Sequence, residues 1–344
     1  AVNLGIIAIL YMSGKEVNNG SLMYGGVIAL INYASQILVE LIKFANTVVL
    51  LSRASASLNR LETVMDTKPS LIFPDRQATA SISEEAVRFN HVSLRYQGAG
   101  EESLTDISFC AMRGQTIGVI GGTGSGNSTL VNLVPNFYSA TKGQVLIDGV
   151  NADEYDRAAL LSAVSVVPQK AVLFEGTIRS NLLMGNPNAS EAELFSALET
   201  AQAAEIVRTK PNGIDEPVLR GGSNFSGGQK QRLSIARALV HGGRILILDD
   251  SASALDFATD AKLRAAIRKL SPAPTTFIVS QRAASVMFAD FIIVLDEGRA
   301  VGQGTHEELL RNCAVYREIY ASQFPDEAAK LSIPNNTPEG DAAK

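Results

Sequence analysis

The chain is poor in residues that build metal clusters and covalent cross-links. Its 344 residues include two cysteines, three histidines and no tryptophan. Cys110 and Cys313 lie far apart in the sequence and indicate neither a zinc site nor a disulfide framework, so a reducing compartment suits them. A surplus of positive charge is also missing, because the net charge is −5. We therefore expect no nucleic acid among the primary partners.

No recognisable leader opens the sequence. Methionine does not stand first, and no basic segment precedes the apolar residues 2–12, which fall well short of the length that spans a bilayer. We expect the sequence to begin inside a longer one. Residues 2–12 then form the end of a membrane helix, and residues 13–21 form a polar turn.

A long apolar run without proline follows the expected turn. Residues 22–51 are compatible with a helix that continues to Asp66, and Arg53 and Arg60 mark its cytoplasmic end. Polar residues recur along one face of this helix: Asn32, Gln36, Glu40, Lys43 and Thr47. Because charged groups at membrane depth usually face a watery cavity, we expect this face to line a translocation path. The alternative is packing against neighbouring helices, with Glu40 and Lys43 as an ion pair.

The remaining sequence alternates between short apolar strands and helices, which is typical of an α/β fold with a parallel sheet. Strands are predicted at residues 87–96, 104–112, 143–148, 163–167, 245–248, 275–279 and 291–295, and a helix at 191–207. The expected domains are the end of a membrane domain (1–68), a linker marked by two prolines (69–84), the α/β domain (85–325) and a disordered tail (326–344).

One predicted strand runs into a glycine-rich turn, and a helical pattern begins near Ser128. The spacing fits the phosphate-binding P-loop, G-x-x-x-x-G-K-[ST], except that Asn127 stands in place of lysine. Glycine N–H groups and the start of a helix form a cradle for an anion. The predicted ATP-binding residues are Gly121, Gly122, Thr123, Gly124, Ser125, Gly126, Asn127, Ser128 and Thr129.

A second strand ends in two acidic residues. Asp249 follows the apolar residues 245–248, where a P-loop site holds Mg²⁺ together with the Ser128 hydroxyl. Asp250 comes next, at the position of a general base for an attacking water. An exposed aspartate at a strand end is equally typical of an ordinary loop, so this residue alone decides nothing.

The segment NFSGGQKQR at residues 224–232 is the most specific motif. It combines a hydroxyl, glycine N–H groups and the start of a helix at 229–239, which together form a second phosphate clamp. The clamp residues are Ser226, Gly227, Gly228 and Gln229. With the P-loop and Asp249, this motif resembles the signature of ABC ATPases. Residues 20–324 resemble an ABC exporter, in which a membrane helix runs directly into the ATPase domain.

The resemblance implies a P-loop ATPase domain of the ABC type, with a mixed sheet and a helical subdomain, preceded by a long transmembrane helix. It implies that Tyr96 stacks on adenine and that Gln169 contacts Mg²⁺ and the attacking water. It also implies a head-to-tail dimer, in which each ATP lies between the P-loop of one half and the signature residues of the other. Residues 253–256 resemble the loop that crosses to the partner.

Three positions depart from the pattern of this family. Asn127 replaces the lysine that neutralises the phosphates, Asp250 replaces the glutamate that serves as base, and Gln281 stands at the position of the switch histidine. None of the histidines is expected to substitute, because all three are interpreted as structural: His91, His241 and His306. Catalysis is thus assigned to Asp250, Gln281 and Gln169, with hydrolysis at this P-loop impaired.

The sequence therefore predicts the ATP-binding and membrane-helix part of an ABC exporter half. It would use ATP and Mg²⁺, with Ser128, Gln169 and Asp249 around the metal. The expected partners are the lipid bilayer and a second, non-identical exporter half, because two copies of this chain would form two impaired sites. The expected location is the plasma (inner) membrane, with the ATPase domain in the cytoplasm.

Two alternatives remain open at this point. A soluble ABC ATPase that acts on DNA or ribosomes fits the motifs, although the long apolar helix argues against it. A catalytically inactive nucleotide-binding regulatory subunit, or the product of a decayed gene fragment, fits the three departures. The sequence does not reveal the transported substrate.

Overall fold

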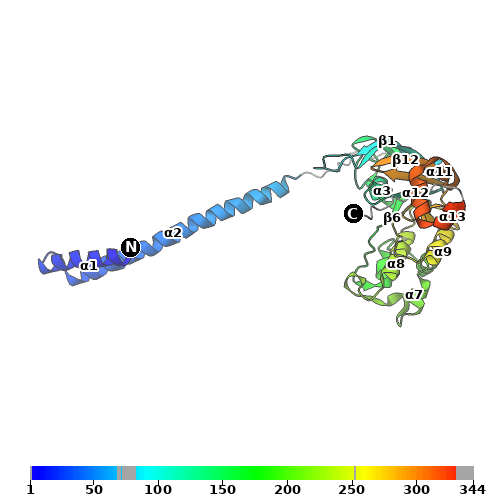
Figure 1. Ribbon diagram of the computed structural model, residues 1–344. Helices are drawn as coiled ribbons and strands as arrows, with labels where there is room; N and C mark the ends of the chain where they lie inside the picture. The colour runs from blue at the N-terminus through cyan, green and yellow to red at the C-terminus, as the bar shows by residue number, and fades with distance from the viewer. Residues whose placement is uncertain (1, 68–70, 72–82, 252, 331–344) are drawn as a thin grey trace, which may run out of the picture. The chain divides into compact units, whose positions relative to one another are not determined.

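A computed structural model of the chain describes residues 2–67, 71, 83–251 and 253–330 (Figure 1). It divides into two compact units, residues 1–70 and residues 71–344. Most of the expected linker at 69–84 and residues 331–344 of the expected tail lie outside the described residues.

The first unit is a helical hairpin of α1 (Val2–Asn18) and α2 (Tyr24–Met65), which lie side by side in Figure 1. The expected polar turn at 13–21 is wrong for residues 13–18, which are helical. A glycine-based cap explains the later end of the helix. Gly20 takes a left-handed φ of 76°, its N–H donates to the Val17 carbonyl, and the N–H of Ser21 donates to the Glu16 carbonyl.

By its length and composition, helix α2 is long and apolar enough to cross a membrane. All of its residues are described, and none is buried within the structure. Glu40 and Lys43 form an ion pair of 2.7 Å along the predicted polar face, as the packing alternative anticipates. This pair leaves the translocation-path hypothesis untested.

The second unit contains two main sheets. An antiparallel sheet has the order β2-β1-β4-β5, and a six-stranded sheet has the order β12-β11-β3-β10-β9-β6. All neighbours in the larger sheet are parallel except the edge pair β11 and β12. The strands are β1 (Glu85–Leu94), β2 (Leu104–Met112), β3 (Thr116–Gly121), β4 (Lys142–Ile147), β5 (Val150–Asn151), β6 (Val164–Val167), β9 (Ile245–Asp249), β10 (Thr275–Val279), β11 (Phe291–Asp296) and β12 (Arg299–Gly304).

Helices pack against the strands of the larger sheet, and a short antiparallel pair, β7 (Gly176–Thr177) with β8 (Pro217–Val218), packs against α5 (Ile178–Leu183). The described helices are α3 (Asn127–Asn132), α4 (Arg157–Ala163), α5 (Ile178–Leu183), α6 (Glu191–Thr200), α7 (Ala204–Arg208), α8 (Gly227–His241), α9 (Phe257–Arg268), α10 (Ala283–Val286), α11 (His306–Asn312), α12 (Ala314–Gln323), α13 (Pro325–Lys330), and the 3₁₀ turns η1 (Gly213–Asp215) and η2 (Arg220–Gly222).

The core has two layers because the central strands are apolar on both faces. Every residue of β3, β9 and β10 is buried. Ile117 and Val119 belong to the apolar cluster that includes residues of β1, β2 and β4. Ile120 belongs to the other cluster, which includes residues of α5, α6, α7 and α8. The predicted α/β domain with a mixed sheet after a long apolar helix is confirmed.

Two sequence expectations about helices need correction. The single helix expected at 191–207 is two helices, α6 and α7. The break occurs at Gln202, whose φ is 56° and whose carbonyl accepts a hydrogen bond of 2.8 Å from Arg232. Residues 326–330, expected in a disordered tail, belong to α13, where a first-position proline and a hydrogen bond from the Tyr320 hydroxyl to Glu327 favour the helix.

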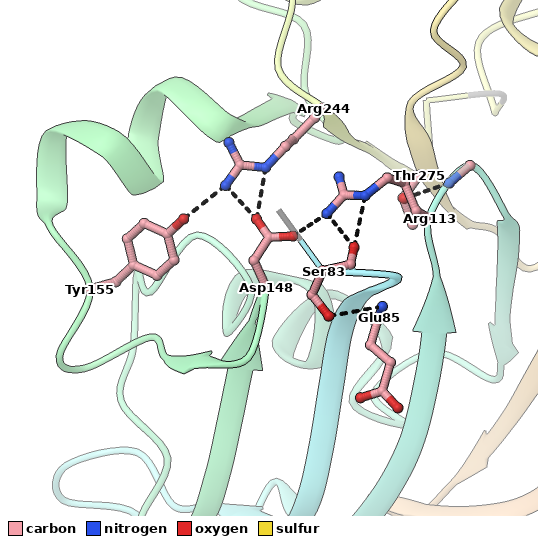
Figure 2. A network of polar contacts seen from close by, with 8 residues as sticks. Ser83, Glu85, Arg113, Asp148, Tyr155, Arg244 and Thr275 are labelled. Atoms are coloured by element: carbon pink, nitrogen blue, oxygen red, sulfur yellow. Dashed lines mark hydrogen bonds and ion pairs between the residues drawn. The ribbon is translucent and has the colours of Figure 1, made fainter. Parts of the chain in front are cut away.

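A buried carboxylate connects the two sheets (Figure 2). Asp148, whose side chain is fully buried, pairs with Arg113 and Arg244. Arg244 Nε lies 2.8 Å from Asp148 Oδ2, and its guanidinium also donates to the Tyr155 hydroxyl at 2.8 Å. Arg113 further donates to the Ser83 carbonyl, just before β1. The network thus fixes the start of β1 against the segments that precede β3 and β9.

Candidate nucleotide-binding site

The glycine-rich loop follows the buried strand β3 and leads into α3. Gly124 and Gly126 have left-handed φ values of 84° and 99°. A Cβ atom on Gly126 would lie 2.7 Å from Leu104 Cδ2 and 2.9 Å from the Ser103 carbonyl oxygen. Glycine is therefore required at this position by both conformation and space.

Ser128 and Asp249 meet as the sequence predicts, although 121 positions separate them. The Ser128 hydroxyl donates to Asp249 Oδ1 at 2.9 Å. Burial raises the pKa of the Asp249 carboxyl, the hydrogen bond from Ser128 lowers it, and the charge of Asp250 raises it. The pair places a hydroxyl oxygen and a carboxylate oxygen together beside the loop.

Asn127 turns back onto its own loop. Its Nδ2 donates to the Gly121 carbonyl at 3.1 Å. Within the described part of the chain, its Oδ1 is buried without a hydrogen-bond partner, and so is the Ser125 hydroxyl. The amide therefore supplies no positive charge where the P-loop pattern has an ammonium group.

A cavity of about 750 Å³ opens beside this loop. It brings together most of the predicted site residues, which line it as follows: Gly122, Thr123, Gly124, Gly126, Asn127, Ser128, Thr129, Gln169, Asp250 and Gln281. Gly121 and Ser125 are buried and do not line it, and Asp249 contacts it through Ser128. Segments distant in the sequence thus share one polar surface.

Asp250 and Gln169, which both line this cavity, contact each other. Gln169 Nε2 donates to Asp250 Oδ2 at 3.3 Å. Asp250 has a φ of 43°, and its N–H donates to the Val279 carbonyl at 3.0 Å. The hydrogen bond to β10 thus holds Asp250 in a left-handed conformation, with its carboxylate at the cavity.

Gln281 lies in the loop between β10 and α10. Its carbonyl accepts a hydrogen bond of 2.9 Å from Gln323 Nε2, and Gln323 Oε1 accepts one of 2.9 Å from the Ala283 N–H. The side chain at the end of α12 therefore holds both sides of this loop.

Tyr96 lies two residues beyond the end of β1, half-buried and outside the cavity lining. Its hydroxyl donates to Thr129 Oγ1 at 3.0 Å, and its ring packs edge-on against Tyr138 at 4.9 Å. Its expected role in stacking on adenine remains a prediction.

The predicted signature residues lie outside the cavity. Ser226 is the exposed N-cap of α8 and forms a capping box with Gln229. A Cβ on Gly228 would lie 3.0 Å from the Ala254 carbonyl oxygen, so the signature glycine packs against the predicted partner-crossing loop. The expected role of these residues at the ATP of a partner remains a prediction.

The three histidines contact other groups and do not line the cavity. His91 Nδ1 pairs with exposed Asp106 at 2.7 Å, and the ring of His241 contacts two backbone carbonyls. Nδ1 of half-buried His306 lies 2.8 Å from the Tyr316 hydroxyl, and burial lowers the pKa of its ring. The capping box of Thr305 with Glu308 at the start of α11 is confirmed.

Several lining residues were not identified from the sequence: Glu101, Glu102, Ser103, Glu297 and Gly298. The first three follow Tyr96 closely in the sequence. Because Tyr96 was expected to contact adenine, their position could have indicated that they line the same cavity. No local signal distinguishes Glu297, which follows β11 in a turn.

The oxygen-rich donors at this site fit a magnesium–nucleotide complex. Among the described residues no group of three or more His, Cys, Asp or Glu side chains could hold a metal alone. Ser128, Asp249 and Gln169 offer a few oxygen ligands, and Mg²⁺ typically takes its remaining ligands from phosphates and water.

The comparisons with known proteins agree with this geometry. The family model described as ABC transporter matches residues 104–253. An uncharacterized ABC transporter ATP-binding protein of Bacillus subtilis, YfiB, is 40% identical over 96% of this chain and 57% of its own length. An ATP-dependent lipid A-core flippase of Xanthomonas oryzae pv. oryzae is 35% identical over 95% of this chain and 55% of its own length.

A solved structure is similar over both units. A bacterial Atm1-family ABC exporter with ATP bound superposes with a TM-score of 0.74 at 30% identity, covering 94% of this chain and 57% of that one. The fold and the site therefore define the ATP-binding domain of an ABC transporter. More narrowly, the chain is similar to ABC exporters over more than nine tenths of its own length, and it spans little more than half the length of the relatives it matches.

Proposed function

We propose that this chain is one half of a heterodimeric ABC exporter, and that its own P-loop site binds ATP but hydrolyses it poorly. The observation that carries this proposal is the cavity that Asn127, Asp250 and Gln281 line together. Three departures from the family pattern thus act on one site.

Physical magnitudes support a strong effect on turnover. Loss of one preorganised charge-stabilising donor costs about 3 kcal/mol of transition-state stabilisation. A misplaced general base costs about 10² to 10⁴ in rate. The two effects do not simply add. Nucleotide binding depends largely on backbone N–H groups, Ser128, Thr129 and Tyr96, and should survive.

In this proposal each residue has a limited task. Glycine N–H groups and Ser128 hold the phosphates, and Asp249 and Gln169 help to hold Mg²⁺, which supplies charge stabilisation when it is bound. Asp250 would orient the attacking water, and Gln281 would contribute a polar side chain to the same cavity. Residues 226–229 donate to the ATP on the partner's P-loop.

The domain assignment and location follow from this role. Residues 1–68 would end the membrane domain, residues 85–325 would form the nucleotide-binding domain in the cytoplasm, and α2 would cross the plasma (inner) membrane. The polar face of α2 would contribute to a substrate path.

The test is the ATPase activity of the complex that a tag on this chain purifies. Asp250→Asn should lower it less than twofold, whereas replacing the corresponding base of the partner should lower it at least tenfold. A larger loss from Asp250→Asn would exclude the proposal.

A non-hydrolysing regulatory subunit is the second candidate, because the Asn127 amide is turned onto Gly121. The same measurement distinguishes the two functions. If this chain is a regulatory subunit, replacing Ser226 should not change the ATPase activity of the complex.

A further inference from the structure

The described residues that line the nucleotide cavity carry negative charge and no positive charge. Its described lining includes Glu101, Glu102, Asp250 and Glu297 and contains no lysine, arginine or histidine. The lysine of the P-loop pattern is the residue that would balance these carboxylates, and Asn127 replaces it.

Backbone contacts fix the acidic segments against the P-loop. The N–H of Gly298 donates to the Ser125 carbonyl at 3.1 Å, and the Gly298 carbonyl accepts from the Thr105 N–H at 2.8 Å. A Cβ on Gly298 would lie 2.8 Å from the Ser103 carbonyl oxygen. The turn that carries Glu297 and the loop that carries Glu101 therefore belong to the same rigid rim.

Only part of this negative charge is compensated. Glu102 forms an ion pair of 2.8 Å with Lys142, whose hydrogen bond lowers the pKa of the carboxyl. Asp250 accepts a hydrogen bond from Gln169, which is neutral. No ion pair is present for Glu101 or Glu297 among the described residues.

We infer that this cavity binds a nucleoside triphosphate only as its divalent-metal complex. Free triphosphate is a polyanion that would approach three carboxylates with partial positive charge from N–H groups alone. A divalent cation held beside Ser128 and Asp249 supplies the charge that Asn127 lacks. The inference rests on the proposed function, because it concerns the same nucleotide cavity.

Equilibrium binding of a fluorescent ATP analogue to the full chain in detergent tests this inference. Removing Mg²⁺ with a chelator should weaken binding by wild type at least about tenfold. Asn127→Lys should lose less than about threefold on the same treatment, because the ammonium replaces the missing charge. Asn188→Lys adds the same charge at an exposed position outside the lining and should behave as wild type.

The dependence of nucleotide affinity on salt concentration is a second measurement. A variant that only disturbs the structure of the loop would not reverse this dependence. Without metal, added salt should strengthen the residual binding by wild type, because it screens repulsion between carboxylates and phosphates. It should weaken binding by Asn127→Lys, where an attraction is screened instead. Glu297→Gln should bind metal-free nucleotide more tightly than wild type.

The outcomes separate this inference from the proposed function. Equal affinity of wild type with and without Mg²⁺ overturns the inference and leaves the nucleotide site in place. Failure of both wild type and Asn127→Lys to bind nucleotide with Mg²⁺, while circular dichroism shows folded protein, overturns both.

Discussion

Asn127 affects the chemistry of its site in two ways: it lacks the positive charge of a lysine, and it forms a hydrogen bond within its own loop. Its amide donates to the Gly121 carbonyl and leaves Oδ1 buried without a partner in the described chain. An ammonium at this position would face phosphate instead. A substitution of one residue thereby changes an anion-attracting loop into a nearly neutral one.

Restoring the family pattern should restore turnover. The triple variant Asn127→Lys, Asp250→Glu, Gln281→His should raise the ATPase rate of the purified chain about 10²-fold or more, because it returns a charge donor and a base of full reach. Release of inorganic phosphate measures this rate. Adding Ser226→Ala to the triple variant should cancel the gain, and a triple variant no faster than wild type would contradict the assignment of these residues.

His306 should make stability depend on pH. Burial lowers the pKa of its ring in the folded state, so the folded protein disfavours the protonated form. Stability is then complete above the ordinary pKa of about 6.5 and is lost as the pH falls below it. His306→Gln should flatten the decline of Tm between about pH 7 and pH 5.5.

Exposed His91 provides the matched control for this measurement. The comparison variant is His91→Gln, which removes a histidine whose side chain is exposed. An equal flattening by both variants would show that His306 is not the group responsible.

At the scale of elements, Asp148 joins the two sheets through two arginines (Figure 2). Asp148→Asn keeps a residue that tolerates the φ of 50° and removes only the charge. It should lower the free energy of unfolding by about 3 kcal/mol, because two partly buried guanidinium groups lose their common anion.

Chemical denaturation of the chain in detergent measures this loss. Glu199→Gln removes one side of an exposed ion pair with Arg208 and should cost less than about 1 kcal/mol. Similar losses from both variants would mean that the buried carboxylate does not stabilise the junction.

The sequence predicted those elements whose signals are local. The P-loop and the acidic end of β9 are contiguous motifs, and the structure places both in the expected elements. The signature motif lies at the start of α8 as expected, although this helix begins at Gly227 and not at residue 229. The break at Gln202 depends on a hydrogen bond from Arg232 in another helix. The position of Glu297 depends on the parallel pairing of Leu295 with Gly121. Neither tertiary contact has a local sequence signal.

At the scale of the whole molecule, the exposed Ser226 and the cavity at Asn127 belong to different composite sites in the proposed dimer. Ser226→Ala should therefore lower the ATPase activity of the complex at least tenfold, through loss of a donor to the partner's ATP. The variant also loses a helix cap, which costs about 1 kcal/mol of stability. Ser190→Ala removes an equivalent capping box at α6 and isolates that contribution.

ATPase assays of the purified complex compare the two cap variants. Ser190→Ala should retain most of the activity. If Ser226→Ala retains as much as Ser190→Ala, this chain's signature does not serve a hydrolysing site.

Gln323 connects the last turn of α12 with both sides of the loop that contains Gln281. A premature stop codon just upstream of Gln323 would thus remove the support of a loop at the nucleotide cavity. The truncated protein would therefore show the same defect as a mutation in the nucleotide cavity. Truncations just upstream of Gln323 and missense changes in the nucleotide cavity should accordingly weaken ATP binding by this chain in the same way.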